Sequence, residues 1–430
     1  MSDPTELALH DALRLLRAPA TIRTRCAAIA AAVSGGDSAH FTIDRSRLPA
    51  VSKRVADLTR ERFPDLKIPT HSRWRHFEAG GVDRKAELDT KLAGRNHIAL
   101  ARARFDLALV SVLLDAGAGP QWRFSEAESS KTFTRSEGLA VASFRAFIAG
   151  RFSSDVGDPC RVDAAALLRI NAAALAEIFQ VDAANPLVGL EGRAALLRRL
   201  GEALRERPEV FTSTGQPGHL FDALTHHPHA PRLRHHRPAP STPLQTHVSA
   251  ARILGALLDA FSGIWPQGQS LQPGLPLGDA WRHPHAGGEG PSAGWVPFHK
   301  LSQWLAYSLI EPFEWAGVAV TGLDELTALP EYRNGGLLID AGVIVPRDPQ
   351  FAAQRFTPGD AWVIEWRALT VALIDELAPL VRSELGASAE QLPLACLLEG
   401  GTWAAGRQIA AERRESGAPP VQVDSSGTVF

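Results

Sequence analysis

Apolar residues recur at helical spacing along much of this chain, and that pattern constrains its fold more than any other feature of the sequence. Residues 5–33 predict one or two amphipathic helices, and residues 360–381 predict another that kinks or ends at Pro379. The clearest helix is predicted over 185–207, with Asn185 as its cap. Its apolar face carries Leu190, Leu197, Leu200 and Leu204. These segments favour a mainly α fold.

Strand signals are few by comparison. The segment GLLIDAGVIVP at 336–346 is apolar with β-branched residues near its end, and VQVDSSGTVF at 421–430 alternates around a turn-like centre. We therefore predict helix for more than half of the ordered residues, with strands confined to short pieces near 337–346 and at the C-terminus. No period between 20 and 50 residues repeats, which argues against a solenoid.

The length allows a large core, since 45% of the 430 residues are hydrophobic and 21% are charged. We predict helical lobes over 1–211 and 248–430, or one intimately packed domain. The His- and Pro-rich segment 212–247 is predicted to be a connecting loop. A metal site is the alternative there, and we favour the loop because Pro interrupts helical spacing and no carboxylate or Cys lies among the candidate ligands. Those ligands are His226, His227, His229, His235 and His236.

Charge and cysteine content exclude several classes of function. The formal net charge is −2, from 45 basic and 47 acidic residues, so no overall positive field favours nucleic acid. Cys26, Cys160 and Cys396 lie far apart, which fits neither a disulfide framework nor a zinc knuckle. The first thirty residues resemble neither a secretory signal nor a membrane span. We expect a cytoplasmic protein without nucleic-acid or membrane partners, metal or other cofactor.

Four polar stretches could carry chemistry, and the first is HSRWRHFEAGGVDR at 71–84. Arg73 and Arg75 could form paired hydrogen bonds with an anionic group, and the glycine pair would let the backbone approach a ligand. The alternative is a salt-bridged surface turn with an aromatic anchor. We predict that Arg73, Arg75 and Glu78 contact substrate.

The second stretch, DLALVSVLLDAGAGPQWRF at 106–124, places Asp115 at the end of an apolar run. A carboxylate at the end of a buried element is positioned by that element, and its surroundings decide whether it acts as an acid or a base. The alternative is a solvated Asp at a helix C-terminus. We predict that Asp115 is catalytic and that Trp122 forms a wall of the binding pocket.

The third stretch, DAWRHPHAGGEGPSAGWVPFHKLSQW, places His283, His285, Glu289 and His299 on a Gly-rich segment that runs into a helix near Lys300. These side chains could line a pocket, and His299 is predicted to bind substrate. The His-x-His pair and the following Glu could instead hold a metal, although their spacing fits no established metal motif.

The fourth stretch, TGLDELTALPEYRNGGLLIDAGVIVPRD, brings two carboxylates, a phenol and a guanidinium within ten residues: Glu331, Tyr332, Arg333 and Asp340. A carboxylate beside Arg stays ionised and can activate water or stabilise a cationic transition state. The alternative is a helix–loop–strand junction with surface charges. We predict that Glu331 is catalytic and that the other three bind substrate.

Seven motifs spread over residues 60–410 resemble the uracil catabolism protein four family. They are HSRWRHFEAGG, SVLLDAGAG, RSEGLAVASFRAFIAGRFSSD, NPLVGLEGR, GWVPFHKLSQWLAYSLIEP, LPEYRNGGLLIDAGV and LEGGTWAAGR. The His-rich segment departs from that family's pattern. A weaker resemblance, carried by LLDAGAGPQWRF, DELTALPEYRNGGLLIDAGV and VIEWRALTVALIDELA, is to the queuosine salvage protein, a helical N-glycosidase related in fold to DNA glycosylases.

The first resemblance implies a role in uracil breakdown, linked to a cyclohydrolase-like enzyme and a phosphoribosyltransferase, with urea released downstream. The second implies a large helical glycosidase-like fold and hydrolysis of the N-ribosyl bond of a ribosylurea or its 5-phosphate. Glu331 would then activate water or stabilise the sugar cation, Asp115 would contact the sugar or leaving group, and Arg73 and Arg333 would contact anions. Glu331 falls where the glycosidase has Asp, which leaves its reach open.

Two other functions remain open from the sequence. A non-catalytic protein could bind the ring-opened intermediate in the same pocket. A metal-dependent ureido amidohydrolase would need a metal or an activated nucleophile, and neither is convincing in this sequence.

Overall fold

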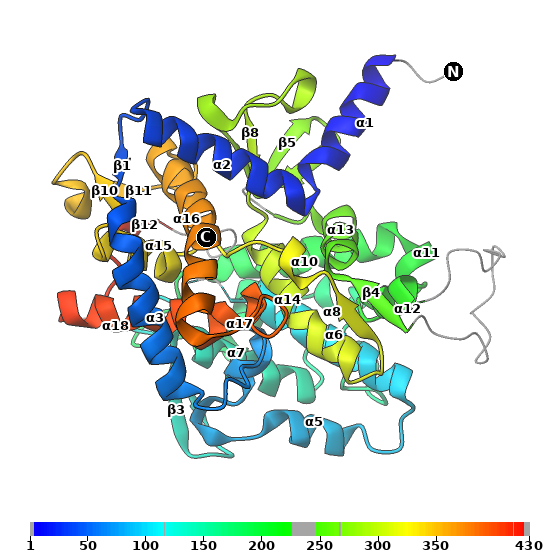
Figure 1. The fold of residues 1–430 in the computed structure, drawn as a ribbon. Helices are drawn as coiled ribbons and strands as arrows, with labels where there is room; N and C mark the ends of the chain where they lie inside the picture. The colour runs from blue at the N-terminus through cyan, green and yellow to red at the C-terminus, as the bar shows by residue number, and fades with distance from the viewer. Residues whose placement is uncertain (1–3, 116, 226–245, 266–267, 416, 425–430) are drawn as a thin grey trace.

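The computed structural model describes residues 4–115, 117–225, 246–265, 268–415 and 417–424. Helix makes up 57% of it, which confirms the predicted mainly α fold (Figure 1). The helices of the first half are α1 (Pro4–Leu16), α2 (Pro19–Gly35), α3 (Leu48–Arg62), α4 (Arg73–Phe77), α5 (Arg84–Lys91), α6 (His97–Leu113), α7 (Arg135–Ile148), α8 (Ala164–Leu167), α9 (Ala172–Ile178), α10 (Leu190–Glu206), α11 (Pro208–Phe211) and α12 (His219–Thr225).

The second half is also mainly helical. It contains α13 (Ala250–Phe261), α14 (Lys300–Glu314), α15 (Tyr332–Asp340), α16 (Ala361–Leu385), α17 (Leu394–Leu397) and α18 (Trp403–Arg413). A π-helical turn at Leu398–Thr402 joins the last two. Such turns are rare and are frequent at functional sites.

The strands are short and pair two by two. Antiparallel pairs are β1 (Phe41–Ile43) with β10 (Ile344–Pro346), β2 (Arg123–Glu126) with β3 (Lys131–Thr134), β5 (Gln269–Gln272) with β6 (Leu275–Gly278), and β7 (Ala280–Arg282) with β8 (Trp295–Pro297). Parallel pairs are β4 (His247–Ser249) with β9 (Ala319–Thr321), and β11 (Arg355–Phe356) with β12 (Gln422–Val423). The prediction that strands are confined to 337–346 and the C-terminus is wrong, because two-residue to four-residue pairs need no long alternating pattern.

Helix α16 forms the centre of the packing. Figure 1 shows it beside α2 and α3, against both of which it packs. Every residue from Trp362 to Val371 is buried, so this part is enclosed on all sides, whereas from Leu373 onward only one face of the helix is buried. Pro379 does not end this helix. The helix continues to Leu385 and stops at Gly386, whose backbone lies in the left-handed region. The helices predicted in 5–33 are confirmed as α1 and α2.

Two sequence predictions of local structure are corrected. Helix α10 begins at Leu190 rather than near Asn185. Gly189 has a φ of 73°, in the left-handed region, so the right-handed helix cannot extend through it. The Asn185 side chain instead bonds to the backbone of Arg123. In the predicted strand at 336–346, residues 336–340 belong to helix α15, 341–343 form a turn, and only the end forms β10.

Close helix contacts explain why α15 contains glycine. A Cβ at Gly335 would lie 2.7 Å from the Trp366 ring of α16, and a Cβ at Gly406 of α18 would lie 2.3 Å from the carbonyl oxygen of Arg333. Side chains cannot be accommodated at such distances. The start of α15 is therefore clamped between α16 and α18.

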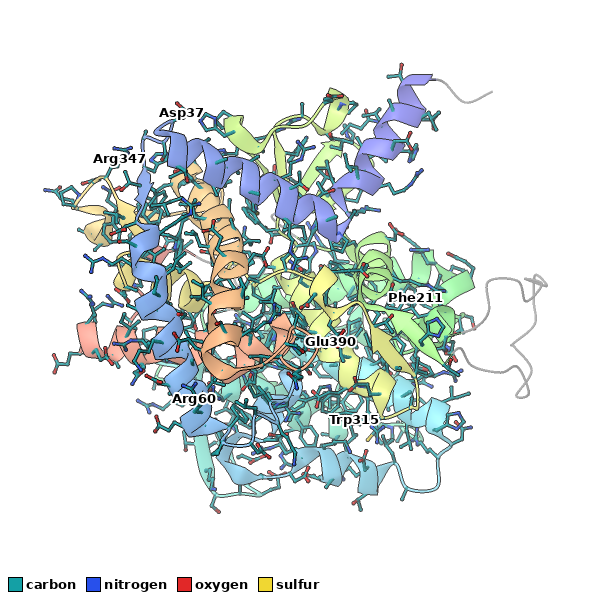
Figure 2. The ribbon with its side chains drawn as sticks, in the orientation of Figure 1. Asp37, Arg60, Phe211, Trp315, Arg347 and Glu390 are labelled. Carbon is teal, nitrogen blue, oxygen red and sulfur yellow. The ribbon has the colours of Figure 1, made fainter. Side chains whose placement is uncertain are left out.

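The short helix α4 is fixed by the end of α14. Trp315, labelled in Figure 2, meets Trp74 edge to face with ring centroids 4.8 Å apart. Lys85 Nζ and the Arg104 guanidinium carbon lie over the Trp315 ring, at 4.7 and 5.2 Å from its centroid. These contacts hold α4 in place and direct the neighbouring Arg73 into the interior.

The predicted connecting loop is partly helical, since α12 lies within 212–247. Residues 226–245, with the five candidate histidine ligands, lie outside the described residues. One hydrophobic cluster contains residues from Ile22 to Val421, on both sides of this segment. The division into lobes stays a prediction. No helix in the described part of the chain is both long and apolar enough to span a membrane.

Candidate functional site

Helix α15 begins at a buried carboxylate. Glu331 is its N-cap, and its oxygens accept hydrogen bonds from the backbone N–H groups of Arg333, at 2.7 Å, and Asn334, at 2.6 Å. Burial raises the pKa of Glu331, while these bonds and the charges of Lys300 and Arg333 oppose the rise. Arg333 thus acts in the predicted direction, but burial has the larger effect. Glu331 has a structural task beside the catalytic one predicted for it.

A second carboxylate, Asp115, follows the end of α6. Arg73 Nη1 lies 2.8 Å from its Oδ1, and Ser136 Oγ, from α7, donates to it at 2.6 Å. Its side chain is 11% exposed. Asp115 is therefore not the solvated residue of the alternative interpretation, since three helices contribute to its position.

Arg73 is fully buried, and its hydrogen bonds are incomplete. Nε donates to Ser111 Oγ at 2.7 Å, and Nη1 lies 3.0 Å from His76 Nδ1. Nη2 has no partner within the described part of the chain. Burial lowers the pKa of Arg73, and the Asp115 charge opposes this. The guanidinium also lies over the Trp304 ring, 5.5 Å from its centroid.

Lys300 is the first residue of α14 and shares this electrostatic environment. The residue before it, His299, has a φ of 48°, a conformation that non-glycine residues seldom adopt outside special sites. The Lys300 backbone N–H donates to Asp279 Oδ2 at 3.0 Å, which anchors the turn. Burial lowers the pKa of the Lys300 ammonium, whereas the charges of Glu331 and Asp115 raise it. Lys300 is thus electrostatically coupled to both predicted catalytic carboxylates.

Two histidine and two tryptophan rings lie next to Arg73. The centroid of the His76 ring lies 5.7 Å from that of Trp304 and 6.4 Å from that of Trp403. The corresponding distances for the His71 ring are 6.3 and 6.2 Å. Burial, followed by the Arg73 charge, lowers the pKa of His76 to about 3. His76 is therefore neutral, and since Arg73 donates to Nδ1, its proton lies on Nε2.

Tyr332 and Arg333 follow Glu331 in the first turn of α15. Burial raises the pKa of the Tyr332 phenol, and the Asp115 charge acts on it in the same direction. The Arg333 guanidinium lies 4.8 Å from the centroid of the Tyr332 ring, and Nη1 donates to the Gly417 carbonyl oxygen at 3.2 Å. Glu331, Tyr332 and Arg333 therefore lie together at the start of α15, and the charge of Asp115 acts on the Tyr332 phenol.

Other predicted substrate ligands are occupied within the fold. Arg75 lies 2.6 Å from a Glu311 oxygen and 3.0 Å from an oxygen of Glu78, whose side chain is largely exposed. Asp340, at the far end of α15, accepts two hydrogen bonds from Arg414. A contact of these residues with substrate stays a prediction, and their observed bonds are those of structural ion pairs.

His299 and Trp122 also have internal partners. His299 Nε2 lies 2.9 Å from the Leu16 carbonyl oxygen, and Trp122 Nε1 donates to the Phe179 carbonyl oxygen at 2.9 Å. Trp122 is fully buried. Its indole ring also meets the Phe179 ring edge to face, and its role as a wall of the binding pocket stays a prediction.

The metal alternative in the third stretch has no support from the described residues. His283 lies 3.5 Å from Glu365, and Glu289 is exposed. No group of three or more His, Cys, Asp or Glu side chains in the described ranges could hold a metal ion.

Sequence reasoning did not select Lys300, His76 or Ser136, although all three contact or influence the predicted residues. A signal existed for Lys300, because lysine is rare in this chain, with six in total, and this one follows a His at a helix start. His76 could have been found by helical spacing, since it lies three residues after Arg73. Nothing in the sequence places Ser136 beside Asp115.

The fold and this cluster define a mainly helical protein whose charged groups meet inside the structure. The chain belongs to the family described as "Protein of unknown function (DUF1688)", whose model matches residues 15–430. It is 37% identical over 422 residues to "Uracil catabolism protein 4" of Lachancea kluyveri, covering 92% of this chain and 93% of that protein. It is 38% identical over 399 residues to "Protein urg3" of Schizosaccharomyces pombe, with 91% and 92% covered. The resemblance to the uracil catabolism protein four family is confirmed.

Proposed function

We propose that this protein acts in uracil catabolism and hydrolyses the N-ribosyl bond of a ribosylated urea. The printed name of the Lachancea kluyveri relative supports the pathway. The reaction is supported chiefly by one observation: Asp115 is held by Arg73 and Ser136 while its charge, with that of Glu331, acts on the half-buried Lys300.

This arrangement suits the charges that develop when a C1–N bond breaks. The sugar ring becomes cationic, and a fixed carboxylate nearby stabilises it. We assign that role to Asp115. Urea leaves poorly unless its nitrogen is protonated, so the reaction also needs a proton donor.

We assign proton donation to Lys300, whose pKa is lowered by burial. The C1–N bond breaks, the ammonium gives its proton to the departing nitrogen, and the oxygen of water bonds to C1. The proton that water loses restores the ammonium, so one water is consumed and urea and the free sugar are formed. Glu331 acts through Lys300 as a positioning residue, since its charge favours the protonated lysine.

The test is direct. Purified protein is incubated with ribosylurea and separately with its 5-phosphate, and urea and free sugar are measured over time. We expect both products in equal amounts, with no loss after extensive chelation. Binding without turnover would support the non-catalytic alternative and overturn hydrolysis. Metal-dependent release of ammonia would favour a ureido hydrolase instead.

A further inference from the structure

Arg333 is a buried cation whose pairing differs from that of most buried arginines here. Arg73, Arg84, Arg104 and Arg367 each have a carboxylate within 4.0 Å. Arg333 is 5% exposed and has no carboxylate at that distance among the described residues. A buried charge is costly unless a counter-charge or several hydrogen bonds compensate it.

The hydrogen bonds of Arg333 do not supply that compensation. Its Nη1 donates to one carbonyl oxygen, at Gly417, and its side chain also hydrogen-bonds to the Tyr332 phenol, but Nε has no partner in the described ranges. Arg25 also lacks a carboxylate there, but its two terminal nitrogens donate to Ala286 O and Ser292 Oγ. Arg333 thus retains donor capacity inside the fold.

The position of Arg333 connects it to the proposed reaction site. Its charge acts on Glu331 and on Tyr332, and the charge of Asp115 acts on the same Tyr332 phenol. Arg333 and Glu331 lie together at the start of α15, where a Glu331 oxygen accepts from the Arg333 backbone N–H at 2.7 Å. An anion held by Arg333 would therefore lie beside Glu331 and, under the proposed function, belong to the reacting molecule. A pentose phosphate suits this arrangement, since its 5-phosphate lies at the opposite end from C1.

We propose that Arg333 forms the phosphate subsite of this protein, and that its substrate is the 5-phosphate of the ribosylated urea. This inference rests on the proposed function. Ribosylurea itself is neutral and offers a guanidinium no counter-charge. A phosphate monoester supplies negative charge and several acceptor oxygens, and arginine binds it with paired hydrogen bonds.

The experiment measures binding of ribose 5-phosphate and ribose by calorimetry to the full chain and to Arg333→Gln. We expect the wild type to bind ribose 5-phosphate at least tenfold more tightly than ribose. The variant should lose roughly tenfold to a hundredfold of its affinity for ribose 5-phosphate and keep its affinity for ribose, since hydrogen bonds to charged groups have this strength. Arg25→Gln is the matched control, a buried arginine without a carboxylate in the described structure, and should keep the wild-type ratio.

Several results would overturn the subsite. They are equal affinity of the wild type for the two sugars, or an unchanged ratio in Arg333→Gln. If that variant fails to fold, the ratio of affinities for ribose 5-phosphate and ribose decides the question, measured in the wild type and in Arg333→Lys. Equal rates of urea release from ribosylurea and its 5-phosphate would reject the subsite while the hydrolase stands. Arg333-dependent binding of ribose 5-phosphate without urea release would reject the hydrolase while the subsite stands.

Discussion

Two largely buried charge clusters adjoin α4, and they differ in how completely their arginines are paired. In one, Glu126 accepts from Arg84 at 2.8 and 2.5 Å and from Arg145 at 2.6 Å, while Arg145 also bonds to Glu87. The remaining Arg84 nitrogen donates to two backbone carbonyl oxygens. This cluster, defined by Arg84, Glu87, Glu126 and Arg145, is closed.

The second cluster, defined by Arg73, Asp115, Lys300, Glu331 and Arg333, is open. The Arg73 side chain is as fully buried as that of Arg84, yet one of its terminal nitrogens has no partner among the described residues. Burial and ion pairing are thus shared by both clusters and do not identify a functional site. Incomplete pairing distinguishes the open cluster, to which the proposed function assigns the substrate.

The largest expected effect is that of Asp115→Asn. The change keeps the volume of the side chain and removes the charge that would stabilise the sugar cation. We expect the single-turnover rate of urea release to fall about a thousandfold, or roughly 4 kcal/mol. Arg73 keeps its bonds to Ser111 and His76, so stability should fall less than in the next variant. A near-normal rate would remove Asp115 from the chemistry.

Glu126→Gln makes the corresponding change in the closed cluster. It removes the acid that Arg84 and Arg145 share, and losing one partner of a buried pair is strongly destabilising. The free energy of unfolding, measured by chemical denaturation, should fall by about 3 kcal/mol. Urea release per folded molecule should stay unchanged. Reduced turnover with normal stability would break the distinction between the clusters.

The same variant gives a pH test. Burial alone would raise the pKa of Glu126, but bonds from Arg84, Ser129 and Arg145 outweigh it and hold the pKa at about 2. The reference value is 4.5, so the stability from ionised Glu126 is complete above that pH and is lost as the pH falls towards 2. The stability difference between wild type and Glu126→Gln should shrink over this range. A constant difference would contradict the assignment.

Glu331→Gln should have an intermediate effect, since it removes the charge that favours protonated Lys300. We expect turnover to fall about a hundredfold, or roughly 2.7 kcal/mol. The alkaline limb of the pH–rate profile should move to lower pH, because the pKa of Lys300 loses a raising influence. A purely structural cap would instead lower stability by about 1 kcal/mol and leave the profile in place.

A matched pair of serines should show the smallest effects. Ser136 Oγ donates to Asp115 in the open cluster, and Ser129 Oγ donates to Glu126 in the closed one. Ser136→Ala should reduce turnover about tenfold, since one hydrogen bond to a charged group is lost. Ser129→Ala should lower only stability, by about 1 kcal/mol. Exchanged outcomes would show that the clusters have been assigned the wrong roles.

The sequence predicted helices better than the partners of polar side chains. Helical spacing located α1, α2, α10 and α16 because an amphipathic or fully buried helix leaves a regular trace. It misassigned 336–340, because a short apolar run that leads into β-branched residues fits a buried helix and a strand equally well. The capping carboxylate Glu331 was the available sign of a helix start there.

The charged stretches pointed to Arg73 and Asp115, but their meeting depends on the packing of distant helices. The sequence prediction selected Arg75 and Glu78 rather than His76, although His76 lies about one helical turn after Arg73. Arg73 and His76 share the buried face, whereas Glu78 faces solvent. Lys300 and Ser136 reach the cluster only through tertiary structure, which no local spacing encodes.

The contact of Gly406 with the Arg333 carbonyl has a consequence for redesign of this protein. The depth at which α15 sits is set by a missing side chain on α18, outside the cluster itself. A side chain at residue 406 would therefore displace α15 and change the distance between Glu331 and Asp115. A substitution at residue 406 could thus be used to enlarge the binding site without replacing any charged side chain of the cluster.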